Sequence, residues 1–134
     1  MTSNTFKKKE RLKSRKVINR LFKEGQYFGQ YPLRLVWLKM DEPLSDASVQ
    51  FTVSVPKKRF RKAVARNRIK RQMREAYRLN KHRLYRLVNQ DAEEQVAFMV
   101  IYVGKEALPY QVIEKAMRQM IRRFSKKYQP TQED

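Results

Sequence analysis

The residues from Ala65 to Arg78, ARNRIKRQMREAYR, combine dense positive charge with apolar residues at helical spacing. Apart from Glu75, every charged residue in this stretch is arginine or lysine. A guanidinium group can hold two oxygens of one phosphate at once, and an ammonium group adds positive charge without that geometric selectivity. These residue types therefore indicate the binding of phosphate-rich polyanions, provided that the surrounding elements turn the charges outward.

At 100° per residue, the apolar and polar residues of this stretch separate into two faces of a helix. With Ile69 at zero, the two sets fall between about 340° and 80° and between about 100° and 200°. The apolar set is Ile69, Met73, Ala76 and Tyr77. The second set, which we call the cationic strip, is Asn67, Lys70, Arg71, Arg74 and Arg78. Like charges four residues apart destabilise a helix, so we expect an external anion to neutralise the strip. The free N–H groups at the helix start add a further anion site.

The overall charge indicates the kind of partner. Lysine and arginine total 32 against 13 acidic residues in 134, which gives a formal net charge of +19. Such self-repulsion in a chain the size of one domain indicates a polyanionic partner, with nucleic acid first. The absence of cysteine excludes disulfides and thiolate chemistry. The basic start MTSNTFKKKERLKSRK has no apolar segment behind it, so it does not fit a secretory signal, and no run approaches the roughly 18 apolar residues of a membrane span. We therefore expect a cytoplasmic protein, with an organelle transit peptide as the alternative, and no obligate protein partner.

One helix and at least two strands are predicted before the basic helix. Ser14 can cap the first helix, and we expect Gly25 to end it in a left-handed conformation. The apolar arc of this helix is Val17, Ile18, Leu21 and Phe22. The runs PLRLVWLKM (32–40) and SVQFTVSV (48–55) predict strands with a turn over 41–46 between them. In the second run the residues alternate, so we expect a strand covered on the side of Val49, Phe51, Val53 and Val55.

The second half of the chain predicts a helix, a strand and a helix. A basic connector, 57–62, leads into the charged helix, which we expect to fade near 82–90. The run QVAFMVIYV (95–103) is nearly all apolar, which is typical of a strand at the centre of a sheet. A final amphipathic helix follows. Its apolar residues are Val112, Ile113, Ala116, Met117, Met120, Ile121 and Phe124.

The pattern as a whole predicts one domain over 14–128 with the order helix, two or more strands, helix, strand, helix. We expect 1–13 to form a basic, flexible arm that becomes ordered on an anion. The tail YQPTQED is polar and is expected to fray, with 129–134 outside the domain.

The sequence predicts no catalytic or metal site of its own. His82, the only histidine, has no acid at a triad or metal spacing, and we expect it to lie on the surface at a helix end. The adjacent acids Asp41 and Glu42, and likewise Glu93 and Glu94, are typical of solvated loops.

Other functions of a basic amphipathic helix remain open at this point. Membrane surfaces and calmodulin both bind such helices, although the flanking strands indicate that the apolar face here is used by the core. DNA binding also fits the composition. The chain contains no helix-turn-helix or zinc-finger pattern, and a strand and helix with exposed aromatic residues suit RNA better.

The segment SVPKKRFRKAVARNRIKRQMREAYR, Ser54 to Arg78, resembles the signature region of the bacterial ribonuclease P protein component, and RNRIKR is its most specific part. The resemblance runs from RLKSRKVINRLFKEG to the last helix. It implies an α/β (α+β) two-layer sandwich with the order α-β-β-(β)-α-β-α, in which helices flank a small central sheet. It also implies a left-handed β-α-β crossover, where patterning alone would favour a right-handed one.

The resemblance further implies a role in the ribonucleoprotein endonuclease that removes the 5′ leader of precursor tRNA. In that assembly the RNA subunit holds the catalytic Mg²⁺ and the protein assists. The partners implied are the RNA subunit and precursor tRNA. The protein then contributes differential binding of substrate and metal, and no catalytic group.

The resemblance also assigns residues to two surfaces. Lys57 and Lys58 match the basic pair before the signature helix. The motif that faces the RNA subunit is matched by Arg66, Asn67, Arg68, Lys70 and Arg71, and we extend it along the strip to Arg74 and Arg78. Ile18 and Phe22 match positions of a leader-binding cleft between the first helix and the sheet. Ile18 replaces a commoner phenylalanine and cannot stack on a base, and plain core packing is the alternative for both residues.

Two rival functions are carried forward. The first is a structural ribosomal-type or RNA-chaperone protein with no role in cleavage, which the charge alone would fit equally well. The second is a nuclease that acts without RNA, which needs clustered carboxylates that the sequence does not provide.

Overall fold

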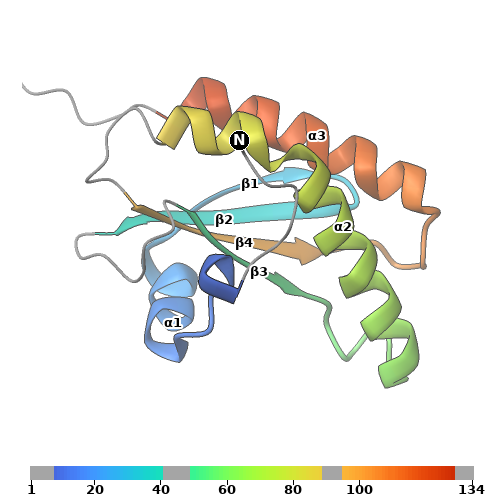
Figure 1. Cartoon of the computed structure of the whole chain (residues 1–134). Helices are drawn as coiled ribbons and strands as arrows, with labels where there is room; N and C mark the ends of the chain where they lie inside the picture. Colours follow the sequence, from blue (N-terminus) through green and yellow to red (C-terminus); the bar gives the residue numbers. More distant parts are fainter. Residues whose placement is uncertain (1–7, 41–48, 89–94, 129–134) are drawn as a thin grey trace, which may run out of the picture.

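The computed structural model describes residues 8–40, 49–88 and 95–128. They form a four-stranded sheet with helices on both faces (Figure 1). In chain order the elements are the short 3-10 helix η1 (Lys8–Glu10), α1 (Arg15–Glu24), β1 (Gln26–Gln30), β2 (Leu33–Met40), β3 (Val49–Ser54), α2 (Ala63–Val88), β4 (Gln95–Tyr102) and α3 (Tyr110–Lys127). The predicted α+β class, with a small sheet flanked by helices, is confirmed.

The strand order is β1-β2-β4-β3, so β4 lies inside the sheet as its apolar sequence predicts. β1 pairs antiparallel with β2, and β2 pairs antiparallel with β4. β3 runs parallel to β4, and α2 connects the two strands. In Figure 1 the path from β3 through α2 to β4 is left-handed, as the family resemblance implies.

The main core lies between the sheet and the layer formed by α2 and α3. Alternate strand residues point to this face, so Leu35 and Trp37 of β2 pack beside Phe98 and Val100 of β4. All four residues predicted as the apolar face of the basic helix are buried here: Ile69, Met73, Ala76 and Tyr77. The Tyr77 ring stacks on Phe51 with ring centroids 3.7 Å apart.

A smaller core lies on the opposite face, beneath α1. The intervening strand residues Val36, Ala97 and Met99 meet Val17 and Leu21 of α1 there. Ser14 caps α1 as predicted, since its side-chain oxygen accepts a hydrogen bond from the Val17 amide at 3.3 Å. Because α1 is only 10 residues long, it covers part of this face and leaves the rest open.

Gly25 ends α1, but the predicted left-handed conformation is wrong. Its φ of −65° and ψ of 146° are extended values that any residue can adopt. Glycine is needed for space instead. A Cβ atom at this position would lie 2.5 Å from the Leu21 carbonyl oxygen and 2.7 Å from Cγ1 of Val36.

Glu10 and Leu12 in the N-terminal segment are buried, which corrects the assignment of this stretch to a flexible arm. Leu12 is 4% exposed, and its amide donates a hydrogen bond to the Phe51 carbonyl at 2.8 Å. Glu10 is buried against α2, where one of its carboxylate oxygens accepts hydrogen bonds from Lys81 Nζ at 2.8 Å and the Tyr85 hydroxyl at 2.6 Å. Residues 1–7 lie outside the described residues.

Several smaller predictions are also corrected. Strand β1 was not placed, because QYFGQ has no alternating apolar pattern. Val112 is 39% exposed on α3, and Tyr128 is buried against Trp37 and Phe124 instead of fraying.

The expected surface position of His82 at a helix end is also corrected. His82 is half-buried within α2, which continues to Val88. Gln50 is buried too, so the second face of β3 is also covered at this position, next to the N-terminal segment that pairs with the strand's edge at Phe51. The predicted turn over 41–46 and the tail 129–134 lie outside the described residues.

The buried Glu10–Lys81 ion pair leads to a stability prediction. We expect Glu10→Gln to lower the free energy of unfolding by about 3 kcal/mol or more, because it replaces the buried carboxylate that faces the Lys81 ammonium with a neutral amide. The double variant Glu10→Gln/Lys81→Met also removes the buried positive charge and should recover part of that loss. Urea unfolding measures both. As a control, Arg20→Gln, which breaks the exposed pair with Glu24, should change stability by less than about 1 kcal/mol. A Glu10→Gln loss as small as that of Arg20→Gln would contradict the prediction.

Candidate nucleic-acid interface

The start of α2 is preceded by a basic connector that side chains hold in place. Lys57 and Lys58 are both exposed in a turn directly after Pro56. Beyond them the Phe60 ring packs on Tyr102 with ring centroids 5.7 Å apart, and the Arg59 guanidinium donates to the Val103 carbonyl. These contacts place the two lysines beside the helix start, where unpaired N–H groups also favour an anion.

Arg66 contributes to this arrangement from within the helix. Its Nη1 donates to the carbonyl oxygens of Phe60 and Arg61, at 2.8 Å each. On the helical wheel Arg66 falls near 60°, on the apolar side and away from the strip. Arg66 therefore holds the connector in place. The next two residues, Asn67 and Arg68, are both exposed to solvent.

The middle of α2 presents the strip as predicted. Arg71 and Arg74 are exposed, and Lys70 is half-buried. Partial burial lowers the pKa of Arg74, and the nearby positive charge of Arg11 lowers it further. An arginine remains protonated despite such a shift, so two positive charges are held close together at this point. An external anion would relieve that repulsion.

Arg78 differs from the rest of the strip because it already has a carboxylate partner. Its Nη2 lies 2.5 Å from Glu75 Oε1, and its Nε donates to Glu75 Oε2 at 3.0 Å. The hydrogen bond from Arg78 lowers the pKa of Glu75, and the same bond raises the pKa of Arg78. Arg78 is thus the strip residue with the least need of an external anion.

A groove opens where α1 leaves the sheet uncovered. It encloses about 380 Å³. Two exposed aromatic side chains line it, Phe22 on α1 at 64% exposure and Tyr27 on β1 at 70%. Arg34 on β2 lines it as well and adds a positive charge beside the two rings. Aromatic faces stack on nucleobases, and arginine binds the phosphates between them.

The two predicted cleft residues are separated by the structure. Phe22 lines the groove, whereas Ile18 is half-buried against the smaller core and is not among the lining residues. Tyr27 and Arg34 were missed because β1 was not recognised. Only the pairing of Tyr27 with Val36 and of Gly29 with Arg34 brings these residues onto the α1 face.

The part of the chain that the structure describes contains no metal-ligand cluster and no membrane-spanning helix. Across 8–40, 49–88 and 95–128, no three His, Cys, Asp or Glu side chains come together to hold a metal ion. In the same ranges, no helix is long and apolar enough to cross a membrane.

These features define a small, strongly basic α+β protein whose longest helix presents charges suited to polyanions, with an aromatic groove beneath its first helix. Comparison with known proteins identifies the family to which the chain belongs. The Ribonuclease P family profile matches residues 6–125, and the chain belongs to the family of ribonuclease P protein components.

Curated relatives and solved structures agree with this assignment. The chain is 44% identical over 123 residues to the ribonuclease P protein component of Porphyromonas gingivalis, which covers 88% of this chain and 85% of the relative. The protein component from Geobacter sp. (strain M21) is 37% identical over 128 residues, covering 96% and 99%. The Staphylococcus aureus RNase P protein superposes with a TM-score of 0.67 at 21% identity, covering 87% and 95%. That from Thermotoga maritima gives 0.65 at 24% identity, covering 85% and 96%, so the structures support the fold.

Gly25 provides a test of the groove geometry. Gly25→Ala should lower the free energy of unfolding by about 1–3 kcal/mol, because its Cβ would overlap a backbone oxygen of α1. Gly29→Ala is the matched control, since nothing lies within 4 Å of a Cβ there and its φ is not positive. The control should be neutral or slightly stabilised. Urea unfolding measures the free energy of unfolding of both variants. Equal values for Gly25→Ala and Gly29→Ala would contradict the close approach of α1 to β2.

Proposed function

We propose that this chain is the protein subunit of ribonuclease P, in which it binds the catalytic RNA subunit and the 5′ leader of precursor tRNA. The observation that carries the proposal is the outward-facing pair Arg71 and Arg74 on α2, next to Arg11, in a chain that belongs to this family. The strip and the ordered connector bind the RNA subunit through its phosphates.

The groove under α1 is the proposed leader site. A leader is single-stranded, and its bases can stack on the exposed rings of Phe22 and Tyr27 while Arg34 neutralises a phosphate. Ile18 supports the groove wall from the smaller core and does not contact bases.

We assign Mg²⁺ to the RNA subunit, as the family resemblance implies. Within the described residues, no three His, Cys, Asp or Glu side chains come together to hold a metal ion. When bound to the RNA subunit, Mg²⁺ supplies the activation of water and the neutralisation of the scissile phosphate. The protein's part is electrostatic. Its cations reduce the repulsion between two polyanions, so that less Mg²⁺ is needed for the substrate and the RNA subunit to approach each other.

The division of labour predicts the outcome of reconstituted cleavage. At low Mg²⁺, only the mixture of protein and RNA subunit should cleave a 5′-extended precursor tRNA to the mature 5′ end, and the protein alone should not cleave at any Mg²⁺ concentration. Cleavage by the protein alone would refute the catalytic assignment. A mixture no better than RNA alone would favour the structural ribosomal-type rival.

The strip predicts how a variant should fail. Arg71→Gln/Arg74→Gln should weaken binding to the RNA subunit and reduce the slope of log K against log salt by about 1–2 units, since each lost phosphate contact removes about 0.7–0.9. High Mg²⁺ should restore cleavage, and Lys105→Gln is the control at an exposed position outside both surfaces. A loss of cleavage that high Mg²⁺ does not restore would contradict an electrostatic role.

The groove predicts a leader-specific effect. Phe22→Ala should weaken binding of a precursor with a leader of several nucleotides by about 5-fold to 150-fold, the range expected for one stacked base, and leave the binding of mature tRNA unchanged. Ile18→Val, a small change in the core beside the groove, is the matched control. Equal losses for both RNAs in Phe22→Ala would place the leader elsewhere.

A further inference from the structure

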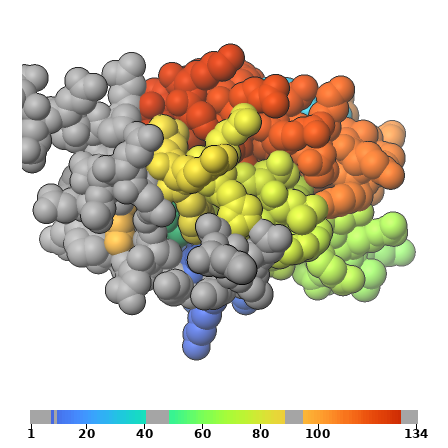
Figure 2. All heavy atoms as spheres, turned by 45° about the horizontal axis from the view of Figure 1, so that its top comes forward, coloured from blue at the N-terminus to red at the C-terminus, as the bar shows by residue number. Residues whose placement is uncertain are grey.

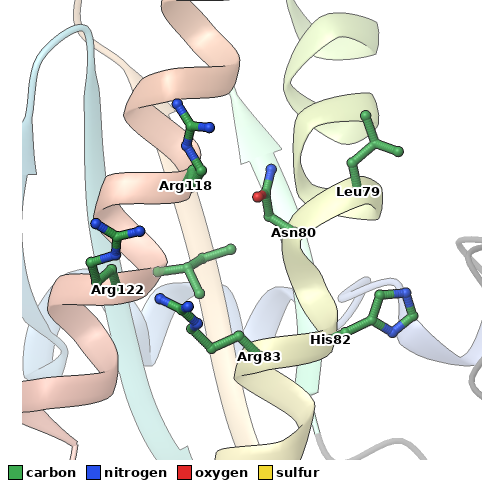
Figure 3. Close-up of a pocket in the computed structure, with 7 residues that line it drawn as sticks. Leu79, Asn80, His82, Arg83, Arg118 and Arg122 are labelled. Carbon is green, nitrogen blue, oxygen red and sulfur yellow. The ribbon is translucent and has the colours of Figure 1, made fainter.

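A second basic surface lies on the outer side of the helical layer, where α2 and α3 run side by side (Figure 2). A recess of about 210 Å³ opens between the two helices. Three arginines line it, Arg83 from α2 and Arg118 and Arg122 from α3, and Figure 3 shows them around the space between the helices. The floor is apolar, since Ile121 is 1% exposed.

The recess is separate from the cationic strip, although α2 contributes to both. On the wheel with Ile69 at zero, Arg83 and Asn80 fall near 320° and 20°, whereas the strip spans about 100° to 200°. The recess faces α3, and the leader groove lies on the opposite face of the sheet, under α1. The leader groove and the recess therefore lie on different sides of the molecule.

The charges in the recess are only partly compensated inside the chain. Arg118 Nη2 lies 3.9 Å from Glu114 Oε2, and the Asn80 amide donates to the Ala76 carbonyl at 2.8 Å. Across the described ranges, the side chains of Arg83 and Arg122 form no hydrogen bond or ion pair. Arg118 and Arg122 are also one helical turn apart, a spacing of like charges that destabilises α3.

These features fit the sugar–phosphate backbone of RNA. Arginines on both walls can hold one phosphate from two sides with bidentate hydrogen bonds. An acidic protein could bind in the same way only if its carboxylates were spaced to match the three arginines. The apolar floor can meet the sugar. Because the leader groove lies on the opposite face of the sheet, the RNA that this arrangement favours is the RNA subunit, bound through a segment different from the one on the strip.

We propose that the recess between α2 and α3 is a second docking site for the RNA subunit, which holds one stretch of its phosphate backbone between Arg83, Arg118 and Arg122. This inference rests on the proposed function. With the strip and the recess on different sides of α2, the RNA subunit must hold the protein at two points, which fixes the orientation of the leader groove.

Binding of the RNA subunit by three paired variants tests the proposal. Arg83→Gln/Arg122→Gln should weaken binding roughly tenfold and lower the salt slope by about 1–2 units. The strip variant Arg71→Gln/Arg74→Gln tests the proposed function separately. Lys16→Gln/Lys105→Gln is the matched control, which removes two exposed cations from α1 and from the connection after β4.

A recess variant indistinguishable from the Lys16/Lys105 control, beside a weakened strip variant, would overturn the second site and leave the proposed function intact. A strip variant that binds as well as the unaltered protein would count against the proposed function instead.

Directed hydroxyl-radical cleavage identifies which RNA lies in the recess, the RNA subunit or precursor tRNA. The chain has no cysteine, so Leu79→Cys in the recess and Val64→Cys at the start of α2 can each carry a single iron chelate that generates hydroxyl radicals. Both positions are exposed, Leu79 at 47% and Val64 at 82%. The two probes should cut the RNA subunit at different nucleotides in the assembled holoenzyme. A Leu79 probe that cuts only precursor tRNA, or no RNA, would overturn the proposal.

Discussion

The antiparallel pairing of β2 with β4 is the constraint on which the other layers depend. Its register sets Leu35 opposite Val100 and Val36 opposite Met99, so successive pairs point to opposite faces of the sheet. One set forms the core beneath α2 and α3, and the other forms the smaller core beneath α1. A slip of one residue would exchange the two sets. The direction of the strip and the depth of the groove therefore both depend on this register.

Much of the fold could be predicted from periodicity alone. The continuous apolar run of β4 and the 3.6-residue repeat of α3 are strong signals, and both elements lie close to where they were expected. The failures share a physical cause. Contacts with residues distant in the sequence fix strand β1, the packed Leu12 and the buried Tyr128. A local sequence pattern does not predict such contacts.

The candidate site was predictable to a similar extent. The wheel separated the strip from the core correctly, since burial of Ile69, Met73 and Tyr77 leaves Arg71 and Arg74 outside. It could not show which arginines are used within the chain. Arg66 satisfies two carbonyl oxygens and Arg78 pairs with Glu75, and those contacts depend on side-chain positions. The groove required the hairpin register that brings Tyr27 and Arg34 together on one face.

The N-terminal segment has a consequence for how separate copies of the chain meet. By pairing with Phe51 through Arg11 and Leu12, it covers part of the outer edge of β3, and at the other edge Gly29 in β1 accepts a hydrogen bond from Arg123 at 2.7 Å. Open strand edges are templates for aggregation. In free solution the charge of +19 keeps two copies apart, but a bound polyanion cancels that repulsion. These contacts at the sheet edges therefore matter most for solubility when a bound polyanion neutralises the protein's charge.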